Sequence, residues 1–144
     1  MSFLNRLLTP LLGLQVAQYR RSKAPTQPRL MGFPALLLTT VGARSGRERT
    51  VPLGGFPDGP EAWLVVASAG GARRHPAWFL NMARNPDRIW IEVGPRRLRV
   101  CAESLGGEQR RQALERIVAI APRYAGYQEK TDRELPVVRL TPAE

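Results

Sequence analysis

The stretch from Leu36 to Pro52 reads LLLTTVGARSGRERTVP, a short apolar run followed by a glycine-bracketed loop rich in arginine. The leucines predict a buried strand. Gly42 and Gly46 can adopt positive φ, so successive backbone N–H groups could converge on one point. The side chains that add donors suited to phosphate or carboxylate oxygens are Arg44, Ser45, Arg47 and Arg49. The pattern predicts an anion-binding loop, with a plain arginine-rich hairpin turn as the alternative.

The composition indicates an anionic partner. The chain has 144 residues, the size of one domain, with 22 Lys and Arg against 12 Asp and Glu, a net charge of +10. Such a balance fits nucleic acid, an acidic membrane surface or a small polyanionic ligand.

The scarcity of cysteine and histidine limits the chemistry that side chains alone could perform. Cys101 is the only cysteine and His75 the only histidine. An internal disulfide is excluded, a metal site is not expected, and a lone cysteine suits a reducing cytoplasm. Neither residue lies in a sequence resembling a nucleophile motif. An enzyme of this composition would therefore depend on a bound cofactor.

The first 34 residues predict an amphipathic helix and a linker, separate from a domain over residues 35–144. Apolar residues from Phe3 to Leu14 form a wide stripe, and Ala24 to Pro28 is typical of an extended connector. The apolar run is too short to span a bilayer. The helix would either pack on its own domain, or cover the substrate or lie on a membrane surface.

The remaining chain predicts a small antiparallel β-barrel with peripheral helices, in the α+β class. Apolar alternation and turn residues indicate about six short strands, mostly joined as hairpins. The predicted strands span residues 35–41, 50–56, 63–67, 88–93, 97–104 and 135–140, and the predicted helices span residues 77–84 and 108–121.

A second candidate site follows the third predicted strand. Small residues from Ser68 to Gly71 precede a helix, so their backbone could approach a flat ligand, although an ordinary strand-to-helix connection fits as well. Tyr124 and Tyr127 are three residues apart and would share a helical face. They could line a substrate pocket, or they could be packing residues whose hydroxyls are exposed to water. By helical spacing alone, Trp78 is a core residue.

Four ordered segments resemble the deazaflavin-dependent nitroreductase family, the split-barrel reductases of actinobacteria that use coenzyme F420. The segments span residues 37–53, 65–82, 85–86 and 127–138. The resemblance implies a split β-barrel, a cytoplasmic enzyme, and hydride transfer from the reduced cofactor to a quinone, nitro or enone acceptor. It also implies that the positive charge serves a cofactor and not nucleic acid.

The same resemblance implies roles for particular residues. The cofactor's phosphodiester and oligoglutamate tail would be held by Arg44, Ser45 and Arg49. The residues implied to contact the deazaflavin ring are Val51, Pro52, Ala67, Ser68, Ala69, Gly70, Gly71, Trp78 and Asn81. The residues implied to face the substrate, and hence to be catalytic, are Ser68, Tyr124 and Tyr127.

The chain departs from the family pattern in three places, which involve four residues. Ala69 stands where relatives often have lysine, so Arg73 or Arg74 would supply that charge. Gly54 and Gly55 replace an aromatic residue, and Ala121 replaces a tyrosine. These changes predict a wider or differently tuned pocket. They leave the identity of the electron acceptor open. The alternative is a non-catalytic module that binds F420, lipid or nucleic acid.

Overall fold

The computed structural model describes residues 13–22, 27–30, 32–68, 71 and 73–143. Its strands are β1 (Arg29–Leu30), β2 (Phe33–Val41), β3 (Glu48–Gly54), β4 (Phe56–Pro57), β5 (Trp63–Val66), β6 (Trp90–Val93), β7 (Arg96–Ser104) and β8 (Val137–Pro142). Its helices are residues 13–21, α2 (Ala77–Arg84), α3 (Gly107–Ile120) and α4 (Arg123–Glu129). No helix within these residues is long and apolar enough to cross a bilayer.

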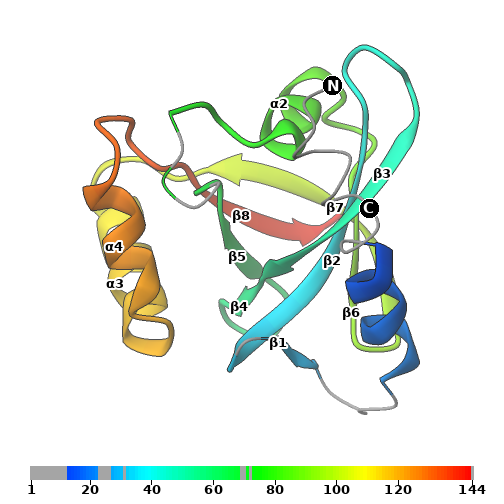
Figure 1. Ribbon diagram of the computed structural model, residues 1–144, viewed down its shortest axis with the longest axis horizontal. Coiled ribbons are helices and arrows are strands. Elements are labelled where there is room, and N and C mark those ends of the chain that lie inside the picture. Colours follow the sequence, from blue (N-terminus) through cyan, green and yellow to red (C-terminus); the bar gives the residue numbers. More distant parts are fainter. Residues whose placement is uncertain (1–12, 23–26, 31, 69–70, 72, 144) are drawn as a thin grey trace.

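The strands form one curled antiparallel sheet. The order is β1-β2-β6-β7-β8-β5-β4, and β3 pairs with β2 outside this path. Because only Gly55 separates β3 from β4, one run of chain joins the two ends of the sheet. The sheet therefore closes into a barrel, with α2 near the tip of the β2–β3 hairpin and α3 beside α4 at another end (Figure 1). The predicted α+β split barrel is confirmed.

Most predicted elements match the structure, and the differences have local causes. The predicted helix over 77–84 has those bounds, whereas the predicted strand over 50–56 is broken at Gly55. Gly55 N–H still donates to the carbonyl of Pro34 on β2, but Pro34 has no N–H to continue the ladder, and the chain turns toward β5 from Phe56 onward. Strand β2 begins at Phe33 and pairs with β1, so the expected boundary after residue 34 lies inside this strand.

The barrel has apolar side chains on both faces of its central strands. On β5, Trp63 and Val65 point into the barrel while Leu64 and Val66 face a second cluster under α3 and α4. This arrangement explains why the strand is a continuous apolar run without alternation. Strand β2 shares this property, with Leu36 and Leu38 inside the barrel.

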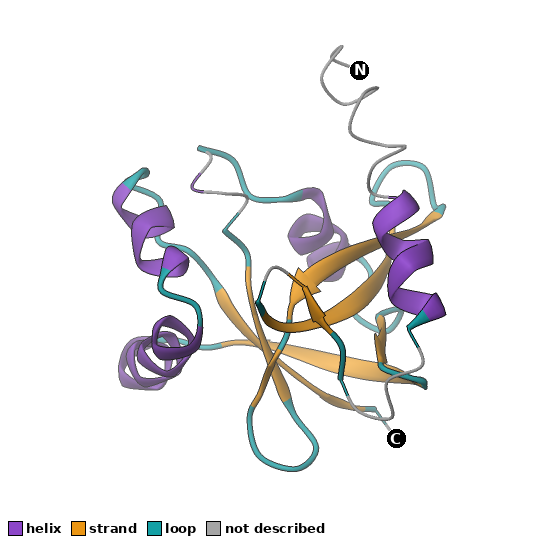
Figure 2. Cartoon of the chain, turned by 60° about the horizontal axis from the view of Figure 1, so that its bottom comes forward, coloured by secondary structure: helices purple, strands orange, loops and turns teal. Residues whose placement is uncertain are grey.

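The helix over residues 13–21 packs on the outside of β2 and β6 (Figure 2). Val16 and Tyr19 cover Ala35 and Leu37, and the Tyr19 hydroxyl donates to the Ala35 carbonyl at 3.0 Å. Arg20 makes a forked ion pair with Glu92, with N–O distances of 3.0 and 2.8 Å. The described part of the helix thus packs on its own domain. The predicted membrane-contacting stripe lies mostly outside the described residues.

Replacing Gly55 by alanine is expected to destabilise the barrel corner. An added Cβ would lie 2.4 Å from Leu36 Cδ2 and 2.5 Å from its Cγ, and Leu36 is fully buried. Overpacking of this kind costs about 1 to 3 kcal/mol. Chemical denaturation of Gly55→Ala would measure the loss. Gly126→Ala in α4 is the control, because nothing lies within 4 Å of its added Cβ. Equal stability of Gly55→Ala and the wild type would contradict the close packing.

Candidate functional site

The arginine loop connects β2 to β3 as a tight hairpin turn. Gly42 N–H donates to the carbonyl of Arg47 at 2.8 Å, and Gly46 N–H donates to the carbonyl of Gly42 at 2.9 Å. Gly46 has the expected positive φ of 70°, but Gly42 does not have a positive φ. Gly42 is required instead by close approach, since a Cβ there would lie 2.5 Å from Ser45 Oγ.

The prediction that successive backbone N–H groups are free to converge on an anion is wrong for most of this loop. Besides the two glycine N–H groups, Arg47 N–H donates to Ser45 Oγ at 3.2 Å and Ala43 N–H donates to Asn81 Oδ1 at 3.0 Å. These groups are satisfied within the protein. The donors left for a ligand are therefore chiefly the guanidinium groups.

Those guanidinium groups are exposed and uncompensated. Among the residues that the structure describes, Arg44, Arg47 and Arg49 have no acidic partner, whereas Arg20 and Arg139, for example, are paired with carboxylates. A cavity of about 330 Å³ lies between the loop and α2. It is lined by Gly42, Ala43, Arg44, Ser45, Arg49, Ala77, Leu80 and Asn81. Unpaired arginines beside an open cavity suit phosphate or carboxylate groups.

Asn81 on helix α2 anchors the loop that lines this cavity. Its side chain is buried, its Nδ2 donates to Thr40 Oγ1 at 3.2 Å, and its Oδ1 accepts from Ala43 N–H. The predicted cofactor contact thus lines the cavity, while its amide is used to hold the loop. The sequence resemblance marked the residue without revealing this role.

The second predicted group lies around the segment that follows β5. Ala67 is fully buried, and Ser68 is half-buried, with its carbonyl accepting from Gly71 N–H at 2.8 Å. Gly71 has a φ of 84°, and a Cβ added there would lie 2.7 Å from the carbonyl oxygen of Tyr127. Gly71 therefore lies directly against the Tyr127 backbone of α4. Ala69 and Gly70 lie outside the described residues.

Tyr124 and Tyr127 share one side of α4 as predicted. Their rings meet edge to face at 5.3 Å, and Tyr124 also contacts Phe33 and Phe56. Among the described residues, the Tyr124 hydroxyl has no hydrogen-bond partner, and it keeps some access to solvent, because no fully buried side-chain oxygen or nitrogen in this part of the chain lacks a partner. Burial, assisted by the neighbouring Tyr127 and opposed by Arg123, raises the pKa of Tyr124 to about 12. This phenol is thus neutral at physiological pH and can donate a hydrogen bond.

The aromatic cluster corrects one sequence-based expectation. A Cβ on Gly54 would lie 2.6 Å from the Tyr124 hydroxyl and 3.0 Å from the ring of Phe33. The space beside this glycine is therefore filled by neighbouring rings and does not widen a pocket.

The other predicted cofactor residues lie apart from the arginine cavity. Trp78 is buried in the barrel interior, with half-buried Val51 packed against the same cluster. Pro52 lines a different cavity of about 400 Å³ beside the N-terminal helix, and Arg74 is exposed. The structure brings Arg44, Ser45, Arg49 and Asn81 together at one cavity. It brings Ser68, Gly71, Tyr124 and Tyr127 together at a second place.

A curled antiparallel barrel with an uncompensated arginine loop is the arrangement of a split-barrel protein that takes an anionic ligand. The family model of F420H(2)-dependent quinone reductases matches residues 11–142, and the chain belongs to this family. The sequence-based assignment to F420-dependent oxidoreductases is thereby confirmed, with coenzyme F420 as the cofactor.

Individual relatives agree with this assignment. An F420H(2)-dependent quinone reductase of Mycobacterium tuberculosis is 42% identical over 135 residues, covering 91% of this chain and 89% of the relative. The solved structure of the F420-H2 dependent reductase FDR-A has a TM-score of 0.67 at 37% identity, covering 78% of this chain and 98% of that one. A chain described as a domain-swapped dimer has a TM-score of 0.68 at 33% identity, covering 92% and 99%.

Sequence reasoning missed Arg133. Its guanidinium donates to the carbonyls of Ala67 and Ser68 from the segment between α4 and β8. The segment 127–138 was part of the family resemblance, and its polar residues between a helix and a strand were the available signal.

The raised pKa of Tyr124 predicts a late-titrating tyrosine. In a spectrophotometric titration of tyrosinate formation, the difference between wild type and Tyr124→Phe should isolate a group ionising near pH 12, since burial disfavours the phenolate. A free tyrosine ionises near pH 10. An isolated group with that ordinary value would contradict the effect of burial on the Tyr124 side chain.

Proposed function

We propose that the chain binds reduced F420 with its phosphodiester and glutamate tail on the arginine loop, and reduces a quinone. The observation that carries this proposal is the set of exposed arginines, Arg44, Arg47 and Arg49, without acidic partners in the described residues, beside a cavity that can take acidic groups. The family's cofactor has such an acidic tail. The donor set of the cavity therefore fits the cofactor that the family uses.

The ring of the cofactor would lie toward the segment after β5. Ser68 and Gly71 offer a backbone that packs closely on α4, and Val51 is half-buried on the neighbouring barrel wall. When bound, the reduced deazaflavin supplies the hydride. The protein would hold the ring and the acceptor in one orientation and shield them from water, which converts an encounter into a positioned reaction.

Tyr124 is the residue best suited to assist the acceptor. A quinone becomes a quinol by gaining one hydride and one proton, and negative charge develops on its oxygen meanwhile. The neutral Tyr124 hydroxyl has no hydrogen-bond partner among the described residues, so it is available to donate to that oxygen. Gly71 links the other two residues predicted to face the substrate, because it packs on the Tyr127 carbonyl oxygen and its N–H donates to the Ser68 carbonyl.

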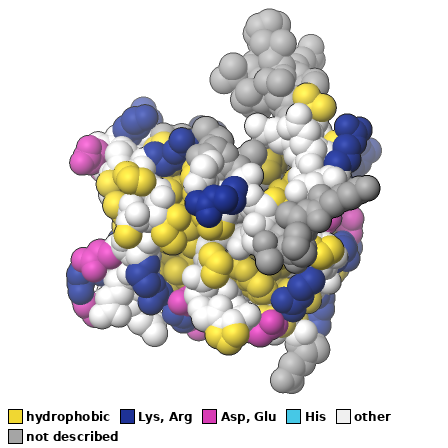
Figure 3. All heavy atoms as spheres, turned by 90° about the horizontal axis from the view of Figure 1, so that it is seen from below, with side chains coloured by type: hydrophobic (Ala, Val, Ile, Leu, Met, Phe, Trp, Pro, Cys, Tyr) yellow, Lys and Arg dark blue, Asp and Glu magenta, His cyan; other side chains and the backbone are white. Residues whose placement is uncertain are grey.

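Nucleic acid is less well supported as the partner. Trp63 and Trp78 are buried, and Trp90 lies under the guanidinium of Arg97 at 5.3 Å. These side chains do not offer the stacking platforms that single strands require. On the face shown in Figure 3, basic side chains are spread out, with acidic side chains and apolar surface between them.

The arginine loop is tested by Arg49→Ala. Loss of one charged hydrogen bond to the tail should weaken binding of oxidised F420 by about 1.5 to 3 kcal/mol. A fluorescence titration at two salt concentrations measures the effect, because the salt dependence of binding should fall with the charge. Arg47→Ala is the matched comparison, since Arg47 shares the loop but does not line the cavity, and should lose less. An unchanged dissociation constant for Arg49→Ala would remove Arg49 from the site.

The role of the phenol is tested by Tyr124→Phe. This change keeps the ring packing and removes only the hydroxyl, so kcat for quinone reduction should fall on the order of a hundredfold while thermal stability stays near that of the wild type. Tyr19→Phe is the opposite control. Its hydroxyl bonds to Ala35 and Gly94, so stability should fall without a change in kcat. An unaltered kcat in Tyr124→Phe would exclude the donor role.

A further inference from the structure

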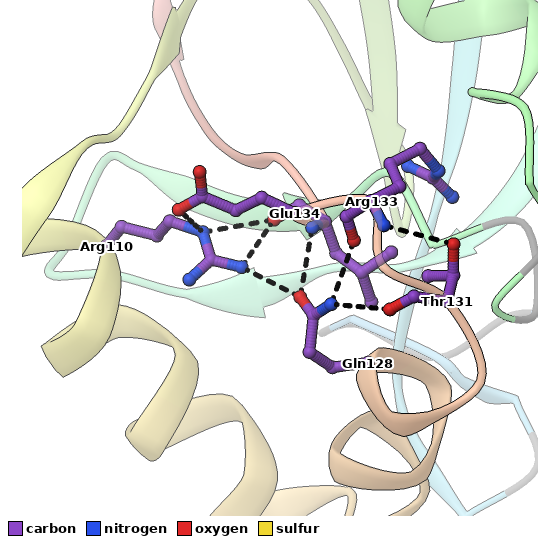
Figure 4. Close-up of polar contacts among 6 residues, drawn as sticks. Arg110, Gln128, Thr131, Arg133 and Glu134 are labelled. Carbon is purple, nitrogen blue, oxygen red and sulfur yellow. Dashed lines mark hydrogen bonds and ion pairs between the residues drawn. The ribbon is translucent and has the colours of Figure 1, made fainter.

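The segment between α4 and β8 is held by polar side chains that the site described above does not use. Figure 4 shows Gln128 at the centre of this network. Its Oε1 accepts from Leu135 N–H at 3.0 Å and from Arg110 Nη2 at 3.2 Å. Its Nε2 donates to the carbonyl of Arg133 at 2.8 Å. One amide therefore fixes both ends of the turn.

Arg110 and Thr131 complete the support of this turn. Arg110 on α3 donates to the Leu135 carbonyl through Nε at 3.1 Å and through Nη2 at 2.8 Å, and pairs with Glu134 at 3.2 Å. Thr131 Oγ1 accepts from Arg133 N–H at 3.2 Å. The backbone of Arg133 is thus fixed on both sides, which limits where its side chain can point.

The Arg133 guanidinium contacts residues just after the end of β5 and a residue just before α2. Its Nη1 donates to the Ala67 carbonyl at 2.9 Å, and its Nη2 donates to the Ser68 carbonyl at 2.8 Å. Nη1 also lies 2.9 Å from Nδ1 of His75, the last residue before Pro76, which caps α2. A rigid fork suits this geometry, whereas a lysine ammonium is a single point on a flexible stem.

The contact with His75 determines the state of that ring. A guanidinium has no acceptor atom and keeps its protons, so His75 Nδ1 must accept. The imidazole is then neutral, with its proton on Nε2. Its ring also packs on Phe79 of α2, with centroids 4.9 Å apart.

We infer that Arg133 is a positioning residue that fixes the backbone of Ala67 and Ser68 beside α4, and so sets the place of the deazaflavin ring. Gly71 packs on the Tyr127 carbonyl oxygen, and Arg133 holds Ser68, so the two halves of the predicted substrate site are joined through this segment. The inference rests on the proposed function, in which the ring lies on this backbone. In this role Gln128, Thr131 and Arg133 position the site without contacting the cofactor.

The first test separates the ring from the tail. Arg133→Lys, with Arg133→Gln as a second variant, would be titrated with oxidised F420 and with the deazaflavin riboside that lacks phosphate and glutamate. Both ligands should bind about tenfold more weakly to Arg133→Lys, with the salt dependence unchanged. Arg49→Ala should instead weaken binding of F420 alone. A loss confined to F420 would make Arg133 a tail-binding cation, and no loss in either variant would also overturn the inference.

The second test needs no cofactor. His75 is the only histidine, so nitrogen NMR of protein labelled at histidine reports one ring. The wild type should show a neutral ring protonated at Nε2 with a hydrogen-bonded Nδ1. Arg133→Gln should lose that signature, while its near-UV circular dichroism spectrum should remain that of a folded protein. A ring protonated at Nδ1 in the wild type would overturn the contact. Failure of the wild type to bind either deazaflavin would instead overturn the proposed function, even with the His75 signature intact.

Discussion

The barrel depends on the corner at Gly55, where one strand changes partners. Before the corner β3 pairs with β2, and after it β4 pairs with β5 at the far end of the sheet. The backbone can bend there only because Leu36 packs directly against a residue without a side chain. The chain closes the sheet at this corner, and the barrel interior and the outer cluster under α3 and α4 lie on opposite faces of the closed sheet.

The corner also determines where the site lies. Gly54 sits one residue before it and contacts the Tyr124 hydroxyl, so α4 is held against the barrel wall at this point. At the other end of β3, the hairpin carries the arginine loop to α2, where Asn81 fixes it. The same strand therefore connects the anion cavity to the tyrosine pair.

The high positive charge has two distinct uses in this molecule. Arg116 and Arg139 share Asp58, and Arg20 pairs with Glu92, so these arginines connect elements of the fold. Arg133 satisfies backbone carbonyls. Exposed ion pairs contribute little to stability, but they orient side chains. The net charge of the chain is thus a poor measure of its ligand-binding surface, which we propose is the loop from Arg44 to Arg49.

The sequence by itself determined the local structure and the chemical class. Alternating or continuous apolar runs predicted the strands, Asn85-Pro86 predicted the end of α2, and the matched segments identified the cofactor family, because these signals are local. The tertiary structure decided the rest. Whether loop N–H groups are free depends on Asn81, 38 residues from Ala43. The role of Arg133 depends on Ala67, 66 residues away. Contacts between such distant residues exist only after the sheet has closed, so no local pattern could specify them.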